Sequence, residues 1–252
     1  MEFQELLIKR FGKRVEHVTL QTANGLVFQP EQIFLAQEPN KDKCSACPAH
    51  VYRQDLPFWL GSHRNKKLMV IAQDAGKGEE DYGFNTVFSI HAAHLNKEEY
   101  FKASSKHHLY FAFFQEIIGS SDFLQHIYFT DIVKCAYSTG PKGSFELASC
   151  KQDIEVELKE VNPSALLLMG KPAQHAFTVL FMNQVNKYHE VKTLSCQINK
   201  RGSIAFTHLK LNDKDVFLAP HLIGNLHIGM DFKTEFFDFK QEVIAYMHAC
   251  IN

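Results

Sequence analysis

Four of the six cysteines have a spacing that suits a metal ion or an iron–sulfur cluster. Cys44 and Cys47 form a CxxC pair, and Cys135 and Cys150 form a second pair separated by fourteen residues. A two-residue gap lets a turn present both thiolates to one centre, and folding can bring the distant pair to it. Four thiolates suit either a 4Fe–4S cluster or zinc. In both cases we expect the group to stabilise the fold rather than to do chemistry.

Acidic residues and a histidine stand at the ends of short apolar segments that we predict to be strands. In a parallel sheet the carboxyl ends of the strands share one edge, and ligands of such folds bind there. Two acids, a helix start and a histidine should therefore converge on one polar site. In chain order, the residues at these ends are Gln73-Asp74, Asp131, Gly170-Lys171 and Pro220-His221.

The alternation of strands and helices predicts an α/β fold, a three-layer αβα arrangement with a central four-stranded parallel sheet. The predicted strands cover residues 67–73, 127–133, 164–169 and 216–219. The predicted helices cover residues 98–118, 145–161, 170–186 and 232–250, with a hairpin within 188–212. We expect a single domain over residues 1–252, in which residues 1–66 are an N-terminal extension that carries the first cysteine pair.

Composition indicates an ordinary globular protein. The chain is 45% hydrophobic and 22% charged, and no run of about 20 apolar residues predicts a membrane span. The first residues lack the apolar core of a secretory signal, and six cysteines without a disulfide framework fit a reducing compartment. We expect a cytoplasmic monomer. A net charge of −1 neither favours nor excludes a nucleic-acid partner, although local basic clusters occur.

One stretch resembles a motif of the uracil-DNA glycosylase superfamily. Residues 72–89, AQDAGKGEEDYGFNTVFS, resemble its GQDPYHGxGxAxGLAFS segment. The resemblance implies that Asp74 orients the attacking water, that Gln73 contributes through its backbone, and that Phe88 stacks on a flipped base. Gly76 replaces the tyrosine that blocks a thymine methyl group, so we expect that a base with such a methyl group is not excluded. The stretch also resembles the GEAPGxxED loop of the branch that carries a four-iron cluster.

A second stretch resembles the same iron–sulfur branch. Residues 128–138, YFTDIVKCAYS, resemble its TNVVKCRPP segment, and Asp131 replaces the asparagine that reads uracil. A carboxylate only accepts hydrogen bonds unless it is protonated, so it suits an amino group such as that of cytosine. The resemblance implies a 4Fe–4S cluster, with zinc as the alternative. The cysteines that match the spacing of this branch are Cys44, Cys47, Cys135 and Cys150.

A third stretch lies where the superfamily has its HPS motif. Residues 218–227 read LAPHLIGNLH, which keeps the imidazole as His221 and replaces Pro-Ser with Leu222-Ile223. The resemblance implies that His221 stabilises the departing base. Leu222, or a nearby apolar residue, would fill the gap in the duplex.

Two functions follow as hypotheses. The first is a DNA repair glycosylase that hydrolyses the N-glycosidic bond of a flipped, deaminated or modified base, with single- or double-stranded DNA as partner. The alternative is a non-catalytic protein on the same fold that carries a cluster or zinc and binds nucleic acid or nucleotides.

Overall fold

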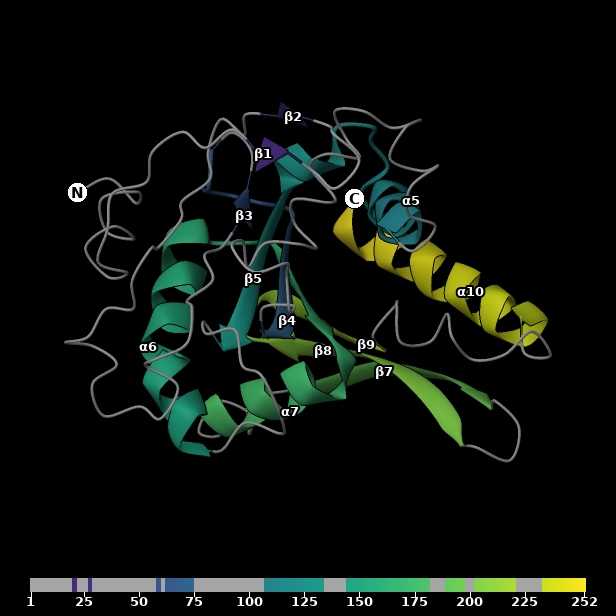
Figure 1. Cartoon of the computed structure of the whole chain (residues 1–252). Coiled ribbons are helices and arrows are strands. Elements are labelled where there is room, and N and C mark those ends of the chain that lie inside the picture. Colours follow the sequence, from purple (N-terminus) through teal and green to yellow (C-terminus); the bar gives the residue numbers. More distant parts are fainter. Residues whose placement is uncertain are drawn as a thin grey trace.

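A seven-stranded mixed sheet forms the centre of the molecule, with the strand order β3-β5-β4-β6-β9-β8-β7 (Figure 1). The structure is a computed structural model. It describes residues 20–21, 27–28, 58–59, 62–74, 107–133, 144–181, 189–197, 202–220 and 233–252. Two short strands, β1 (Leu20–Gln21) and β2 (Val27–Phe28), form a separate antiparallel pair.

The four strands in the middle of the large sheet are parallel, as the sequence predicts. They are β5 (Ile127–Val133), β4 (Leu68–Asp74), β6 (Ala165–Met169) and β9 (Lys214–Ala219). Each contains a short apolar run, and every residue of β6 is buried. Parallel strands need such runs because helices cover both of their faces.

Antiparallel strands extend this parallel centre on both sides. β3 (Phe58–Trp59) pairs with β5 at one edge. β8 (Ser203–Leu211) pairs with β9, and β7 (His189–Gln197) pairs with β8 to form the other edge. The predicted strand number of four is therefore wrong for the whole sheet and right for its parallel centre. The predicted hairpin is real, but it adds its strands to the same sheet.

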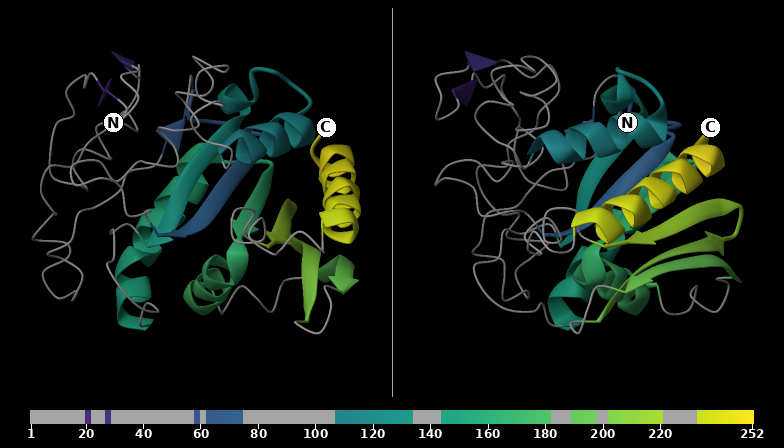
Figure 2. Two further views of the ribbon diagram at one scale, coloured as in Figure 1. Left: turned by 45° about the vertical axis from the view of Figure 1, so that its right-hand side comes forward. Right: turned by 90° about the vertical axis from the view of Figure 1, so that its right-hand side faces the viewer.

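Helices cover the two faces of the sheet in separate layers (Figures 1 and 2). One layer contains α6 (Ser144–Val161) and α7 (Gly170–Leu180). The other contains α5 (His107–Ile118) and α10 (Lys233–Ile251), which pack on each other. Opposite faces of β5 show the division: Thr130 hydrogen-bonds Glu157 of α6, whereas the ring of Phe129 packs edge-on against Phe114 of α5 at 5.2 Å. The predicted three-layer αβα class is confirmed.

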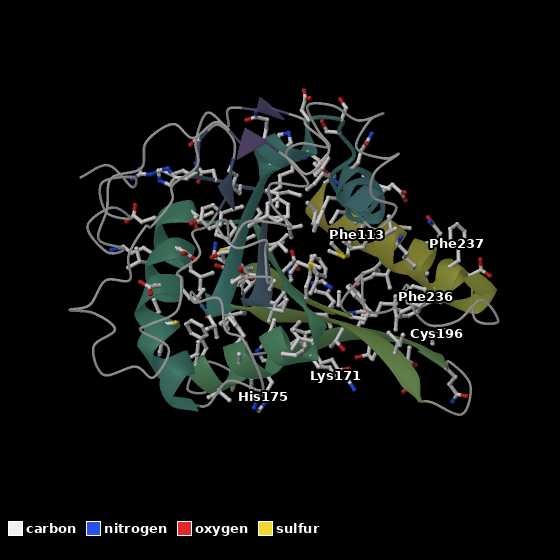
Figure 3. The ribbon with its side chains drawn as sticks, in the orientation of Figure 1. Phe113, Lys171, His175, Cys196, Phe236 and Phe237 are labelled. Carbon is white, nitrogen blue, oxygen red and sulfur yellow. The ribbon has the colours of Figure 1, made fainter. Side chains whose placement is uncertain are left out.

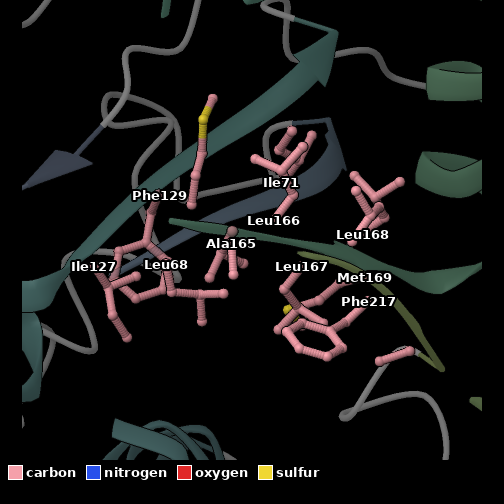
Figure 4. Packing of buried hydrophobic residues seen from close by; sticks show 14 of the residues in the cluster. Leu68, Ile71, Ile127, Phe129, Ala165, Leu166, Leu167, Leu168, Met169 and Phe217 are labelled. Atoms are coloured by element: carbon pink, nitrogen blue, oxygen red, sulfur yellow. The ribbon is translucent and has the colours of Figure 1, made fainter. Parts of the chain in front are cut away.

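The hydrophobic core follows the parallel strands. Leu68, Leu166 and Phe217 are fully buried side chains from three neighbouring strands (Figure 4). Burial of such side chains contributes roughly 1.5–3 kcal/mol each before entropy losses are counted. This core fixes the register of the strands and hence the positions of their ends.

Within the N-terminal extension, Phe58–Trp59 pairs with β5. The division of the chain at residue 66 remains a prediction. In the parts of the chain that the structure describes, no helix is long and apolar enough to cross a membrane.

Candidate functional site at the carboxyl end of the sheet

The parallel register brings four strand ends to one edge of the sheet. β4 ends at Asp74, whose backbone pairs with Val133 at the end of β5. On the other side, Met169 at the end of β6 pairs with Ala219 at the end of β9. This edge is where open α/β sheets bind ligands. The predicted meeting of the four strand ends at one edge is therefore confirmed for the backbone.

Asp131 lies two residues before the end of β5. It is half-buried and pairs with Ala72 across the sheet. Successive side chains of a strand alternate between faces, so Asp131 lies on the same face as Phe129, the face that α5 covers. A carboxylate at this position could accept hydrogen bonds from a ligand bound on the α5 side of the edge.

The junction between β6 and α7 is a sharp turn at Gly170. Met169 is extended, and Gly170 has a φ of +83°, a left-handed conformation that glycine adopts without a steric penalty. The helix therefore begins directly at the strand end. Gln174, one turn later, donates from Nε2 to the Ala219 carbonyl oxygen at 2.9 Å. This hydrogen bond links the start of α7 to the end of β9.

A cavity of about 610 Å³ lies beside this junction. Its walls are the start of α7, the end of β9 at Leu218 and Pro220, and residues 203–205 and 207 of β8. Among the lining residues that the structure describes, the polar side chains are those of Lys171, Gln174, Ser203 and Thr207, and none of these residues carries a carboxylate. Leu218 pairs with Thr207, so both lie on the face of the sheet that α7 covers, opposite the face of Asp131. The edge thus presents polar groups on two sides.

Cys150 is the one predicted metal ligand whose side chain the structure describes. It lies early in α6 and is 7% exposed. Asp153 and Glu157 follow at helical spacing and are also buried, and Thr130 of β5 donates to Glu157 Oε2 at 2.8 Å. Cys150 therefore belongs to the side of α6 that packs toward β5, the strand that precedes Cys135 by two residues.

Most of the predicted site lies outside the residues that the structure describes. For Gln73 and Asp74 it describes the backbone alone. The roles of these residues stay predictions, as does the convergence of their side chains. Among the described residues, no three His, Cys, Asp or Glu side chains could hold a metal ion together. The predicted site residues that are not described are Gly76, Phe88, His221, Leu222, Cys44, Cys47 and Cys135.

Sequence reasoning missed three polar residues at this edge, Gln174, Ser203 and Thr207. Gln174 lies in a predicted helix whose sequence pattern gives it no special role, and its link to Ala219 depends on the pairing of β6 with β9. Ser203 and Thr207 alternate along a strand with Phe206, which is typical of a sheet with one buried face. This alternation can be read from the sequence. The pairing of β8 with β9 cannot.

Comparison with known families agrees with this geometry. Residues 58–239 match the family model described as the uracil DNA glycosylase superfamily, and the match covers the seven-stranded sheet, α5, α6, α7 and the first residues of α10. The chain belongs to the uracil DNA glycosylase superfamily. A comparison with curated proteins gave no match.

Proposed function

We propose that this protein is a DNA glycosylase that hydrolyses the N-glycosidic bond of a flipped, deaminated or modified base. One observation carries the proposal beyond family membership. The parallel strands end at one edge of the sheet. β4 places the backbone of Asp74 at this edge, and the chain leaves β9 at the same edge through Pro220. His221 follows Pro220 directly in the sequence.

The chemistry would need four side chains at this edge. A base stacked in a duplex is inaccessible, so the nucleotide must first be extruded. Asp74 would then orient the attacking water and favour the cationic sugar. His221 would stabilise the negative charge on the leaving base, an electrostatic contribution of about 3 kcal/mol. Phe88 would stack on the base, which contributes about 1–3 kcal/mol. Leu222 would fill the gap left in the duplex.

The choice of base would depend on Asp131 and Gly76. An ionised Asp131 accepts hydrogen bonds and would favour a base with an exocyclic amino group over uracil. Gly76 carries no side chain that could exclude a substituent at the 5-position of a pyrimidine. We therefore propose a base other than plain uracil as the preferred substrate, with backbone contacts from Gln73.

A 4Fe–4S cluster, with zinc as the alternative, would be held by Cys44, Cys47, Cys135 and Cys150. Four thiolates suit either group, and the placement of Cys150 on the packed side of α6 fits a role as ligand. Bound there, the group would supply structural cross-linking between the segment before β4, the end of β5 and α6. Visible absorbance of the purified protein would indicate the cluster, and metal analysis of a colourless protein would indicate zinc.

A second candidate function has specific support in the same residues. Asp131 replaces the amide that reads uracil, and Leu222-Ile223 replaces the Pro-Ser turn. Both changes would also fit a non-catalytic protein that binds nucleic acid or nucleotides on this fold.

Base release from defined oligonucleotides separates the two functions. Single-stranded and duplex substrates carrying uracil, hypoxanthine, xanthine or substituted cytosines are incubated with the protein and cleaved with alkali. We expect release of at least one base, with a loss of about 100-fold or more in Asp74→Asn and in His221→Ala. Asp131→Asn should shift the preference toward uracil.

The matched control is Asp213→Asn, because Asp213 is an exposed acid in the turn between β8 and β9, at the opposite end of the sheet. It should keep wild-type activity. Tight DNA binding without release of any base would contradict the glycosylase and support the non-catalytic alternative.

A further inference from the structure

We propose that β7 pairs with β7 of a second copy of this chain, so that the two sheets join side by side in a symmetric dimer. This dimer would replace the monomer expected from the sequence. It is independent of the proposed function, because it involves an edge strand of the sheet and not the carboxyl ends of the parallel strands.

β7 is the last strand of the seven-stranded sheet. It pairs with β8 on one side, and no strand in the described part of the chain pairs with its other side. With nine residues it is longer than each of the four parallel strands. An edge strand presents a row of backbone N–H and C=O groups that another strand can pair with. β7 is therefore the place where this sheet can be extended.

The first part of β7 is protected against such an extension. The register with β8 shifts between Glu190 and Lys192, which makes Val191 the extra residue of a β-bulge. Bulges and exposed charges both discourage an edge from pairing with another strand. Glu190 and Lys192 are exposed, so this part of the strand has both kinds of protection.

The second part of β7 has neither kind of protection. Residues 193–197 read TLSCQ and contain no charged residue and no proline. They pair with residues 203–207 of β8 in a regular register. We call residues 193–197 the open edge segment. It is where we expect a further strand to pair.

The two faces of the open edge segment differ in polarity. Leu194 pairs with Phe206, whose ring packs edge-on against Tyr246 of α10 with centroids 6.0 Å apart. Cys196 lies on the same face because side chains alternate along a strand, and Figure 3 shows it on the α10 side of the hairpin. Both Leu194 and Cys196 are half-buried. The exposed side chains of the opposite face are Thr193, Ser195 and Gln197.

The open edge segment is complementary to itself. In an antiparallel pair with the two-fold axis at Ser195, Leu194 lies opposite Cys196 of the second copy on the α10 face. Thr193 lies opposite Gln197 on the other face, and Ser195 lies opposite its own counterpart. Matched cross-strand pairs of this kind stabilise a sheet, whereas a shift by one residue would place apolar side chains opposite polar ones. The same segment thus satisfies both sides of the contact, which favours a second copy as the partner.

This arrangement leaves the candidate functional site accessible. The two copies of β7 are antiparallel, so the carboxyl ends of the parallel strands point in opposite directions in the two copies. Five paired residues on each side form an interface smaller than the typical one of about 1,600 Å². We therefore expect a dimer that dissociates on dilution.

The test measures association of the full chain by sedimentation velocity from low micromolar to near-millimolar concentrations. Wild type should show a monomer–dimer equilibrium. Ser195→Lys places two lysines opposite each other at the axis and should raise the dimer Kd about tenfold or more. Thr178→Lys, at an exposed position of α7 outside the hairpin, is the matched control and should keep the wild-type Kd.

A charge swap tests the position of the axis. Ser195→Glu alone should weaken the dimer as Ser195→Lys does, because like charges again meet. An equimolar mixture of the two variants should dimerise at least as tightly as wild type, and high salt should weaken this heterodimer. Restored association in the mixture also shows that both variants are folded.

A cysteine at the axis gives a second measurement. Cβ atoms of directly opposed residues lie about 4.5–5.5 Å apart, which small backbone adjustments bring within disulfide range. Ser195→Cys should therefore form a covalent dimer under mild oxidation with diamide. Wild type, which retains Cys196, and Thr178→Cys should not.

The outcomes separate the dimer from the proposed function. A wild-type protein that stays monomeric at every concentration would overturn the dimer and leave the open edge segment to a strand of another protein. A dimer with the same Kd in Ser195→Lys would also overturn it, because the contact would then use another surface. Release of a base, or its absence, changes neither result.

Discussion

At the amino end of the parallel strands, polar groups hydrogen-bond to one another, whereas at the carboxyl end similar groups line a cavity. Before β4, the Asn65 amide donates to the Val161 carbonyl oxygen at 2.7 Å, and Lys66 Nζ donates to the Gln125 carbonyl oxygen at the same distance. Beside the end of β9, Ser203 and Thr207 line the cavity. Polar groups thus connect parts of the fold at the amino end of the sheet, whereas at the carboxyl end they line a cavity.

Loops at the amino end are tied across long sequence distances. Lys214 Nζ donates to Asn162 Oδ1 at 2.9 Å and to the Pro163 carbonyl oxygen at 2.7 Å. Asn252, after α10, donates to the Ile117 carbonyl oxygen of α5 at 3.0 Å. Such bonds stabilise the fold by about 0.5–1.5 kcal/mol each. The comparison predicts that changes at the amino end alter stability and leave DNA binding unchanged, and that changes at the carboxyl end do the reverse.

The largest loss of stability should come from a change in the middle of β6, between the two ends of the sheet. Leu167, in the middle of β6, is fully buried, so Leu167→Ala should lower the free energy of unfolding by about 2–5 kcal/mol. Urea titration followed by circular dichroism measures the change. Ile204→Ala, at a half-buried position near the start of β8, should cost less than the core change. Equal losses would contradict the view that the outer end of the β7–β8 hairpin is peripheral to the core.

At the amino end, Lys66 should make stability depend on pH. Burial lowers its pKa from 10.5 to about 8, so between these pH values the unfolded chain binds more protons than the folded protein. Stability contributed by this residue therefore rises as pH increases from 8 to 10.5, by up to about 3 kcal/mol. Lys66→Met should lack this rise. The measurement is the wild-type minus variant difference in unfolding free energy over this range, and a difference that stays flat would contradict the assignment.

A smaller loss is expected at Lys214. Lys214→Met removes both hydrogen bonds to the loop before β6 and should lower the free energy of unfolding by about 1 kcal/mol, because the group is partly solvated. Lys159→Met, an exposed lysine in the same region, should have no measurable effect. Oligonucleotide affinity should match wild type in both. Weaker DNA binding in Lys214→Met would mean that the amino end also takes part in recognition.

The smallest change in stability should occur at Gln174. Gln174→Leu keeps the size of the side chain and removes its hydrogen bond to Ala219, for a loss of about 0.5 kcal/mol in the free energy of unfolding. Since this bond holds the strand end that leads to His221, base release should fall tenfold or more. Rates of base release with saturating oligonucleotide, beside those of the exposed-helix control Thr178→Ala, measure the effect. Wild-type rates in Gln174→Leu would show that this link does not position the site.

Strands with continuous apolar runs could be predicted from the sequence because burial on both faces leaves little ambiguity. Residues 127–133 were predicted and match β5, and the prediction for β6 differs by one residue. The same apolar runs indicate parallel strands, and they therefore predict that the carboxyl ends of these strands lie at one edge of the sheet. The two-residue strand β3 has no detectable pattern, since its pairing depends on β5.

The hairpin and the cavity could not be placed from the sequence. Exposed residues along β7 indicate a strand at an edge, but they do not show which sheet it joins. Attachment to β9 decides that Thr207 and Ser203 stand opposite Lys171. The contact between Phe129 and Phe114 shows that Asp131 lies on the face that α5 covers. The hydrophobic pattern of the sequence does not specify which helix packs on which face of β5.

The packing of α10 on α5 has a consequence for synthesis. α10 comes last among the described elements and supplies Met247, which is fully buried, whereas α5 and the strands beneath it are made much earlier. A nascent chain would hold this apolar face uncovered until residues 233–251 have emerged from the ribosome. During that interval the face is a target for chaperones and for aggregation, so the yield of soluble protein should depend on how fast the last helix is translated.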